Sequence, residues 1–170
     1  MTPVRCVVDT NVAVVANHTP ASALCAAASA AALRDVMRHG HVFVDDAGDV
    51  VAEYRNNLAP YGPPSPGNAF LKWLLTHEWG GQRVTRVKIT PNGGETGFHE
   101  LPVPADGTRY DPSDCKFLAV AAAHPEHPPI LQALDSKWRG WIGALEACAV
   151  TVHFLCPDEI ERLYRRRADR

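Results

Sequence analysis

The sequence predicts an α/β fold in which helices cover both faces of a parallel sheet. Short, almost continuous apolar runs, such as residues 4–8, are typical of strands buried on both faces. Segments with apolar residues at helical spacing alternate with these runs along the chain. The 170 residues contain no repeat and no interdomain linker, so we expect one domain over residues 1–170.

In the first half of the chain, the predicted strands and helices alternate regularly. After the strand at 4–8, an alanine-rich helix is expected over about 22–38, ended by Gly40. A second strand, HVFVDD, precedes a helix in DVVAEYRNNLA. The loop PYGPPSPG has four prolines in eight residues and cannot continue a helix. A helix over 68–79 then leads to RVTRVKI, whose alternation is typical of an exposed or edge strand.

The second half of the chain begins with an irregular segment. Residues 90–110 are rich in Pro, Gly and Thr and have almost no periodicity, so a long loop is expected there. Pro112 and Ser113 then start a helix in DPSDCKFLAVAAAH. The run in PPILQALD is a third buried strand, and SKWRGWIGALEACA and VTVHFL are a helix and a last strand. The basic tail ERLYRRRADR is expected to be helical only at its start.

Composition and charge are those of an ordinary globular protein. Apolar residues make up 46% of the chain, and no apolar run approaches the ~20 residues of a membrane helix, so no membrane association is expected. The N-terminus, MTPVRCVVDT, reaches an aspartate before a long apolar core develops, so no signal peptide is expected. The formal net charge of -2 gives no global field for a polyanion. A nucleic-acid substrate would need a local basic patch or a metal ion.

The cysteines and tryptophans are expected to be packing residues. The five cysteines are odd in number, scattered and free of CxxC spacing, so we expect reduced thiols in a cytoplasmic protein. They are Cys6, Cys25, Cys115, Cys148 and Cys156. The four tryptophans sit at helical spacing and are expected in the core rather than as platforms for stacked bases. They are Trp73, Trp79, Trp138 and Trp141.

Four acidic residues fall at strand ends or near the starts of the following helices. Asp9 and Asp135 end buried strands, and Asp114 opens a helix. Glu53 lies in the early turns of the helix after the second strand. In a doubly wound parallel sheet, strand ends and helix starts share one edge, where ligands bind. We therefore expect the four acids to converge on one end of the sheet.

Convergent carboxylates indicate a metal site. They raise one another's pKa unless a cation joins them, and hard oxygen ligands suit Mg²⁺ or Mn²⁺. Without a paired nucleophile, such a site indicates metal-assisted hydrolysis of a phosphodiester. Asn11 can hold a metal-bound water without adding charge, and Thr10 offers a hydroxyl and a backbone amide to a phosphate. Arg83 and Arg86, with Lys88 and the tail arginines, are the candidates for phosphate contacts.

Each acid also has an ordinary structural explanation. Asp114 in a first helical turn interacts favourably with the helix dipole, and Asp135 before SKW is a suitable helix cap. An amphipathic helix commonly presents a residue such as Glu53 to solvent. Turn and cap chemistry also explains several neighbouring aspartates. These are Asp45, Asp46, Asp49 and Asp111.

Taken together and in order, the motifs resemble those of the PIN-domain nuclease family. VVDTN resembles the opening strand of that family followed by D-T-N, here residues 9–11. DVVAEYRNNL resembles its mid-chain helix, which carries the metal-site glutamate, here Glu53. DPSDCKFLAVAAAH is similar to the helix that begins with the third acid, Asp114, and ILQALDSKW to the strand ending in the fourth, Asp135. The resemblance covers most of the chain.

The resemblance implies a fold, an activity and partners. It implies an α/β/α sandwich and a nuclease, most often acting on single-stranded RNA, with Mg²⁺ or Mn²⁺ held by Asp9, Glu53, Asp114 and Asp135. Many members are toxins of toxin–antitoxin pairs and symmetric dimers are common, so an antitoxin protein and a second copy are the implied partners. Members often carry a further acid two residues after the last one, where this chain has Lys137. That lysine could contact phosphate or replace part of a second metal site, which leaves one ion and two ions equally open.

Other classes of protein share parts of this pattern. A haloacid-type phosphatase needs a second acid two residues after the first, and Asn11 fills that place. A response-regulator receiver needs an acidic pair at the first strand, whereas VFVDD lies on the second. A catalytically silent PIN-like binding module and a nuclease acting on DNA structures stay open beside the ribonuclease.

Overall fold

Five parallel strands form the central sheet in the computed structural model of the chain, which describes residues 1–17, 21–94, 97–101 and 103–168. The strand order is β3-β2-β1-β4-β5, and every neighbouring pair is parallel. The strands are β1 (Arg5–Val8), β2 (His41–Asp45), β3 (Val84–Val87), β4 (Ile130–Gln132) and β5 (Val152–Phe154). β3 lies at one edge, as its alternating sequence predicts.

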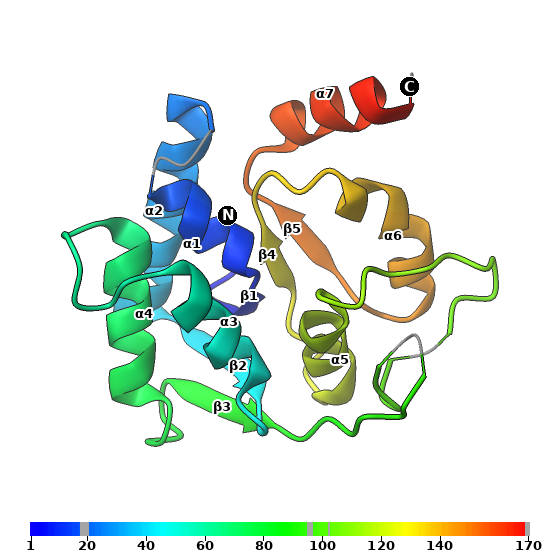
Figure 1. The fold of residues 1–170 in the computed structure, drawn as a ribbon, viewed down its shortest axis with the longest axis horizontal. Coiled ribbons are helices and arrows are strands. Elements are labelled where there is room, and N and C mark those ends of the chain that lie inside the picture. The colour runs from blue at the N-terminus through cyan, green and yellow to red at the C-terminus, as the bar shows by residue number, and fades with distance from the viewer. Residues whose placement is uncertain (18–20, 95–96, 102, 169–170) are drawn as a thin grey trace.

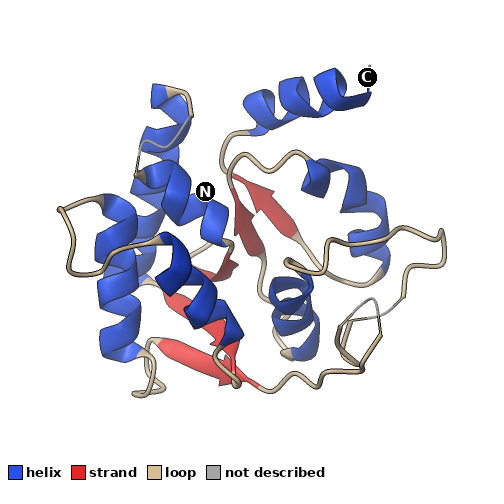
Figure 2. Cartoon of the chain, viewed as in Figure 1, coloured by secondary structure: helices blue, strands red, loops and turns tan. Residues whose placement is uncertain are grey.

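Helices cover both faces of this sheet, so the predicted three-layer α/β/α fold is confirmed (Figure 2). α1, α2 and α4 pack together on one side, and α5 and α6 lie on the other (Figure 1). The helices are α1 (Thr10–Ala16), α2 (Ala23–His39), α3 (Asp49–Asn57), α4 (Pro66–His77), α5 (Cys115–Ala123), α6 (Lys137–Ala147) and α7 (Pro157–Ala168). None of these helices is long and apolar enough to cross a membrane.

The strand order reverses direction at β1. From β1 the chain builds outward through β2 to β3, and it then returns to place β4 on the other side of β1. A crevice at the carboxyl ends of two such neighbouring strands is the usual ligand site of open α/β sheets. Asp9 follows β1 directly, and Asp135 lies in the loop after β4.

α1 is a helix that the sequence did not predict. Its residues TNVAVVA are rich in β-branched side chains, which lower helix propensity. Five of its seven residues are buried, and it packs against α2 and α4. Asp9 caps the helix, since its side chain accepts a hydrogen bond from the Asn11 amide. Tertiary burial and this cap therefore outweigh the weak local propensity.

The predicted helix over 22–38 and the helix predicted in DVVAEYRNNLA (49–59) are confirmed as α2 and α3, although α3 ends two residues earlier, at Asn57. Ser22 caps α2 and Gly40 ends it. The Asp45 carboxylate accepts hydrogen bonds from the amides of Asp49 and Val50, both at 2.8 Å. Asp45 is fully buried, so the expectation that cap chemistry explains this aspartate is confirmed.

Several segments differ in extent from their prediction. α4 begins at Pro66 and ends at His77, two residues earlier at each end than the predicted 68–79. β4 ends at Gln132, so Asp135 lies beyond the strand rather than at its last residue. The tail is helical as far as Ala168, and not only at its start, because α7 is strongly amphipathic. Residues 169–170 lie outside the described residues. The described part of segment 90–110 is irregular as predicted, apart from an antiparallel bridge between Pro91 and Phe98. Residues 95, 96 and 102 of this segment also lie outside the described residues.

Two of the four tryptophans are core residues, as predicted. Trp138 is fully buried and Trp141 nearly so, whereas Trp73 is half-buried at the edge of the core. The prediction is wrong for Trp79, which is 76% exposed. Trp79 lies after the end of α4, where the helical spacing no longer places a side chain toward the core. The Arg86 guanidinium lies 4.0 Å from the centre of its ring.

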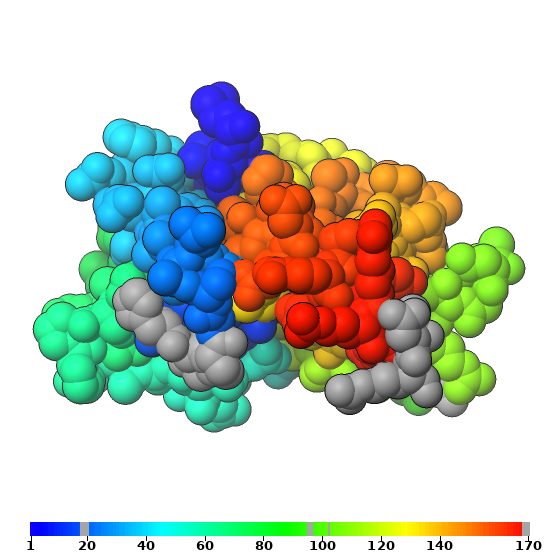
Figure 3. Space-filling model, turned by 90° about the horizontal axis from the view of Figure 1, so that it is seen from above, coloured from blue at the N-terminus to red at the C-terminus, as the bar shows by residue number. Residues whose placement is uncertain are grey.

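The expectation of five reduced cysteines is wrong for one pair. Cys25 and Cys156 form a disulfide across a sequence separation of 131 residues. The fold brings the start of α2 beside the segment that leads into α7, and sequence spacing cannot reveal this contact (Figure 3). Cys6 and Cys115 are free and buried, as expected of packing residues. Burial raises the pKa of Cys6 to about 12 and that of Cys115 to about 11.

Candidate functional site

Asp9 is a buried carboxylate at the carboxyl end of β1. Its Oδ1 accepts the hydrogen bond from the Asn11 amide at 2.7 Å, and only 5% of the residue is exposed. Burial and then the negative charge of Asp114 raise the pKa of Asp9 to about 8, against the opposing hydrogen bond from Asn11. The charges of Glu53 and Asp135 raise the pKa of Asp9 as well. The other three predicted acids therefore lie near enough to act on Asp9.

A single ammonium group lies among three further carboxylates. Lys137 is the first residue of α6, and its Nζ lies 2.8 Å from an oxygen of Asp114. The same Nζ lies 2.8 Å from Asp111 and 3.2 Å from Asp135. Lys137 is thus the cation that joins the start of α5 to the start of α6.

The pKa values of Lys137 and of two of its aspartate partners are shifted, those of Asp114 and Lys137 upward and that of Asp111 downward. Burial raises the pKa of Asp114 to about 6, and the hydrogen bond from Lys137 only partly offsets it. Partial burial disfavours the charged form of Lys137, but hydrogen bonds to Asp111 and Asp114 outweigh burial and raise its pKa. The hydrogen bond from Lys137 lowers the pKa of the more exposed Asp111. The aspartate partners of Lys137 therefore favour its charged form.

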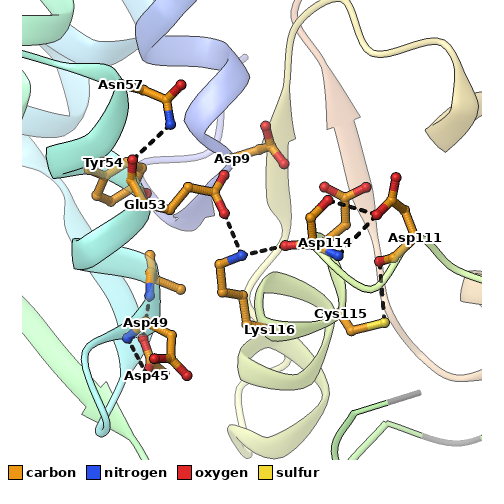
Figure 4. Close-up of polar contacts among 12 residues, drawn as sticks. Asp9, Asp45, Asp49, Glu53, Tyr54, Asn57, Asp111, Asp114, Cys115 and Lys116 are labelled. Carbon is orange, nitrogen blue, oxygen red and sulfur yellow. Dashed lines mark hydrogen bonds and ion pairs between the residues drawn. The ribbon is translucent and has the colours of Figure 1, made fainter. Parts of the chain in front are cut away.

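Glu53 faces a second lysine. It projects from α3 and forms an ion pair with Lys116 of α5, which also donates a hydrogen bond to the Ser113 carbonyl (Figure 4). The next residue on α3, Tyr54, is fully buried and donates its hydroxyl hydrogen bond to the carbonyl of Val8. This bond fixes α3, and hence the backbone of Glu53, against the carboxyl end of β1.

Asn11 and Thr10 occupy the start of α1. The Asn11 side-chain oxygen accepts a hydrogen bond from the Leu134 amide at 2.7 Å. Asn11 therefore holds the loop between β4 and α6, on which Asp135 lies. The Thr10 hydroxyl is buried and has no hydrogen-bond partner within the part of the chain that the structure describes.

The two predicted phosphate contacts donate hydrogen bonds to backbone carbonyls outside this group of acids. Arg83 precedes β3, at the amino ends of the strands, whereas Asp9 lies at the carboxyl end of β1. The Arg83 guanidinium donates to carbonyls at the end of α2, including that of Met37 at 2.9 Å. Arg86 donates to the Asp46 carbonyl at 2.5 Å. Arg86 thus lies beside the carboxyl end of β2 with the exposed ring of Trp79.

The oxygen donors suit a hard divalent cation, but they do not form a ready ligand group. Over the described ranges, no three Asp, Glu, His or Cys side chains stand close enough together to hold an ion. The ammonium groups of Lys137 and Lys116 neutralise the outer carboxylates instead. Among the described residues, Asp9 accepts a hydrogen bond from the Asn11 amide but forms no ion pair with a lysine or arginine.

Sequence reasoning missed two members of the group. Asp111 was expected to be a turn residue, and its Oδ1 does accept the Ser113 amide hydrogen bond at 3.0 Å, while Oδ2 contacts Lys137. Lys116 is not among the predicted site residues. In DPSDCK, however, the two aspartates and the lysine fall within one turn before and after a helix start, and this spacing is a usable signal.

Comparison of the chain with protein-family models, with curated proteins and with solved structures finds no match in any of the three.

Proposed function

We propose that the protein is a metal-dependent nuclease that hydrolyses phosphodiester bonds of single-stranded RNA with Mg²⁺ or Mn²⁺. One observation carries this proposal. Asp9, beside the reversal in strand order, is buried and has its pKa raised by the charges of three acids from other parts of the chain. Buried carboxylates that oppose one another in this way are characteristic of sites that take up a cation.

The proposal gives each of the four acids a role. Asp9 at the end of β1 and Asp114 before α5 would hold the ion, and Asp135 and Glu53 would complete its ligands. Asp114, Asp135 and Glu53 would first have to turn from their lysines. When bound, such an ion polarises a phosphoryl oxygen and lowers the pKa of an attacking water. Asn11 orients the loop of Asp135 through its bond to Leu134. Tyr54 orients the helix of Glu53 through its bond to Val8.

The Trp79 and Arg86 pair supports RNA as the substrate. An exposed aromatic ring with a guanidinium on one face leaves the other face to a base, and stacking of this kind tolerates any sequence. The proposal therefore assigns Arg86 and Trp79 to substrate binding. Arg83 stays a weaker candidate because its donors are occupied by carbonyls of α2.

The proposed partners and cellular compartment follow from the proposed nuclease activity. Cleavage of cellular RNA would take place in the cytoplasm, where the reducing environment would open the Cys25–Cys156 disulfide. A toxin of this kind would bind a small antitoxin protein and could act as a homodimer. Co-expression with the product of a neighbouring gene, scored by relief of growth arrest, tests the toxin role separately from the nuclease.

A catalytically silent binding module is the second candidate. The observation that favours it is the pairing of the outer acids with Lys137 and Lys116, which neutralises them without any ion.

Cleavage of RNA by the purified protein decides between the two. End-labelled single-stranded RNA should be cut in Mg²⁺ or Mn²⁺ and left intact with a chelator. Asp9→Asn should abolish cleavage and keep the fold, because an asparagine oxygen still caps α1. Asp35→Asn, which changes an exposed aspartate on α2, is the matched control and should cleave normally. RNA that stays intact with the wild-type protein and either ion favours the silent module.

A further inference from the structure

We propose that the arginine face of α7, formed by Arg162, Arg165 and Arg166, binds the phosphates of single-stranded RNA. It holds the strand at one end of the acidic site. The inference rests on the proposed function for the choice of RNA as the ligand. It adds a binding surface on a helix that carries none of the four acids, and a direction in which the strand lies.

The three arginines of this face lie on the same side of α7. They are three and four residues apart along the helix, and all three are exposed. Arg165 forms an ion pair with Glu161 at 2.9 Å, whereas Arg162 and Arg166 form no ion pair with any of the described residues. The helix dipole favours arginines in the last turn, but Arg162 lies in the middle of α7. The face therefore carries two positive charges that the described residues do not neutralise.

Contacts with α6 and α2 fix the side of α7 that is presented to solvent. The ring of Tyr164 packs against Gly140 of α6, where a Cβ atom would lie 3.2 Å from the ring. Glu161 also forms an ion pair with Arg139 of α6, at 3.0 Å. Cys156, the residue before α7, is joined to α2 by the disulfide. The arginine face is thus held in place on the surface of the molecule, so a ligand does not have to order the helix (Figure 3).

α7 begins at the same end of the sheet as the acids. It follows the carboxyl end of β5, and Asp9 follows the carboxyl end of β1. Arg86, with the exposed ring of Trp79, lies beside the carboxyl end of β2. In the strand order β3-β2-β1-β4-β5, the acids therefore lie between this pair and α7. A strand of RNA that reaches across the sheet, about 20 Å for five strands, passes the acids on the way.

The phosphates need such flanking charges because the centre of the site does not attract them. Carboxylates outnumber the two lysines there, and the formal net charge of the chain is -2. Neither the site nor the whole molecule therefore provides a positive field. Affinity for a phosphate chain then depends on local groups of basic side chains, and the arginine face is such a group.

Binding of a labelled, unstructured RNA over a series of salt concentrations tests the inference. Fluorescence anisotropy in a chelator measures the affinity without cleavage. The α7 variant, Arg162→Gln with Arg166→Gln, removes the two unpaired charges. Its dissociation constant should rise about tenfold at moderate salt. The slope of log affinity against log salt should become shallower by about 1.4, because each phosphate contact on a single strand contributes about 0.7.

A second pair of exposed arginines provides a matched control. Arg34 and Arg38 are also four residues apart, in the part of α2 that leads to the amino end of β2. Arg34→Gln with Arg38→Gln removes the same charge from the opposite end of the sheet, so its affinity and slope should equal those of the wild type. Arg162→Lys with Arg166→Lys keeps the charges and should keep the slope. Circular dichroism establishes that each variant is folded.

Three results would overturn the inference. The first is an unchanged salt slope in the α7 variant. The second is an equal loss of slope in the α7 variant and in the α2 control, which would show that only the net charge matters. The third is displacement of the bound RNA by polyglutamate as effectively as by unlabelled RNA, which would assign the arginine face to acidic proteins.

The outcomes separate this inference from the proposed nuclease. RNA that binds through the arginine face but stays intact with Mg²⁺ or Mn²⁺ supports the inference and rejects the nuclease. RNA that the wild-type protein cleaves, and that the α7 variant binds with unchanged affinity and slope, rejects the inference and supports the nuclease.

Discussion

The side-chain oxygen of Asn11 accepts a hydrogen bond from the Leu134 amide at 2.7 Å, although the two residues are 123 positions apart. The bond joins the first turn of α1 to the loop that follows β4. These are the two segments that carry Asp9 and Asp135 on either side of the reversal in strand order. The relative position of the two carboxylates therefore depends on an amide that carries no charge.

Replacing Asn11 with alanine should weaken both the fold and the site. The Leu134 amide would be left without its partner in a partly buried loop, and such a loss lowers the free energy of unfolding by about 1–3 kcal/mol. Urea unfolding measures this change. Asn57→Ala, which removes an exposed side-chain bond to the Glu53 carbonyl, is the control and should change stability by less than about 0.5 kcal/mol. Equal effects in the two variants would contradict the role of Asn11.

Tyr54→Phe should lower stability and disturb the position of Glu53. The variant removes the hydroxyl that donates to the Val8 carbonyl and keeps the buried ring. Loss of this buried hydrogen bond lowers the free energy of unfolding by about 1 kcal/mol. Thermal unfolding measures the stability, and Mn²⁺ affinity measures the site. Tyr164→Phe on α7 provides a comparison at a tyrosine that is not buried. Unchanged Mn²⁺ affinity in Tyr54→Phe would show that Glu53 is held in place by other contacts.

In metal-free buffer, the free energy of unfolding should fall as the pH rises from about 4 to about 8. The folded pKa of Asp9 is about 8 and that of Asp114 about 6, both above the ordinary value of 3.8. In this range the unfolded chain has released the two protons and the folded protein still binds them, so rising pH favours unfolding. The lowered pKa of Asp111 has the opposite sign and acts only below 3.8.

Urea unfolding at a series of pH values, with and without Mg²⁺, measures this slope. Asp9→Asn should remove much of it, because the variant side chain does not titrate. Added Mg²⁺ should stabilise the wild-type protein more at pH 8 than at pH 5, since the ion favours the ionised carboxylates. Stability that is flat or rises between pH 4 and 8 without metal would show that Asp9 and Asp114 ionise normally in the folded protein.

Trp79→Ala should weaken the binding of single-stranded RNA while leaving the fold intact. The ring is 76% exposed, and a stacked base contributes about 1–3 kcal/mol, so the dissociation constant should rise about tenfold or more. Fluorescence anisotropy of a labelled RNA, in a chelator to prevent cleavage, measures the binding. Tyr61→Ala removes another exposed aromatic ring, 87% exposed in the loop before α4, and should bind as the wild type does. Equal losses in both variants would indicate non-specific binding to exposed rings.

Reduction of the Cys25–Cys156 disulfide should lower stability without unfolding the sheet. The bond closes a loop of more than a hundred residues, and removing such a cross-link lowers the free energy of unfolding by roughly 2–4 kcal/mol. Thermal unfolding of the oxidised protein and of Cys25→Ser measures the difference. Alkylation under denaturing conditions should label Cys6, Cys115 and Cys148 before reduction and all five cysteines after it. Five labels without reductant would show that the disulfide does not form in solution.

The sheet and most helices follow from local sequence pattern. β1 contains the apolar run CVV and β2 the apolar run VFV, and α2 has a serine cap and is followed by a glycine, so the information lies within each segment. α1 could not be predicted in the same way. Its valines favour strands by propensity, and only their burial against α2 and α4 makes the segment a helix.

The candidate site likewise has a part that the sequence predicts and a part that it does not. The rule that strand ends meet at one edge predicts the proximity of Asp9 and Asp114, and the rise in the pKa of Asp9 reflects it. The pairing of Lys137 with three aspartates, and of Lys116 with Glu53, depends on side-chain positions that sequence spacing does not fix. For the same reason, the sequence could not show that the donors of Arg83 are used by α2.

The bridge between Cys25 and Cys156 spans the irregular segment 90–110. A protease that cut this segment once would leave an amino-terminal fragment with Asp9 and Glu53 and a carboxyl-terminal fragment with Asp114 and Asp135. The oxidised fragments would migrate as one species on a denaturing gel and separate only after reduction. In an oxidising environment, backbone scission there would thus not by itself release either half of the carboxylates.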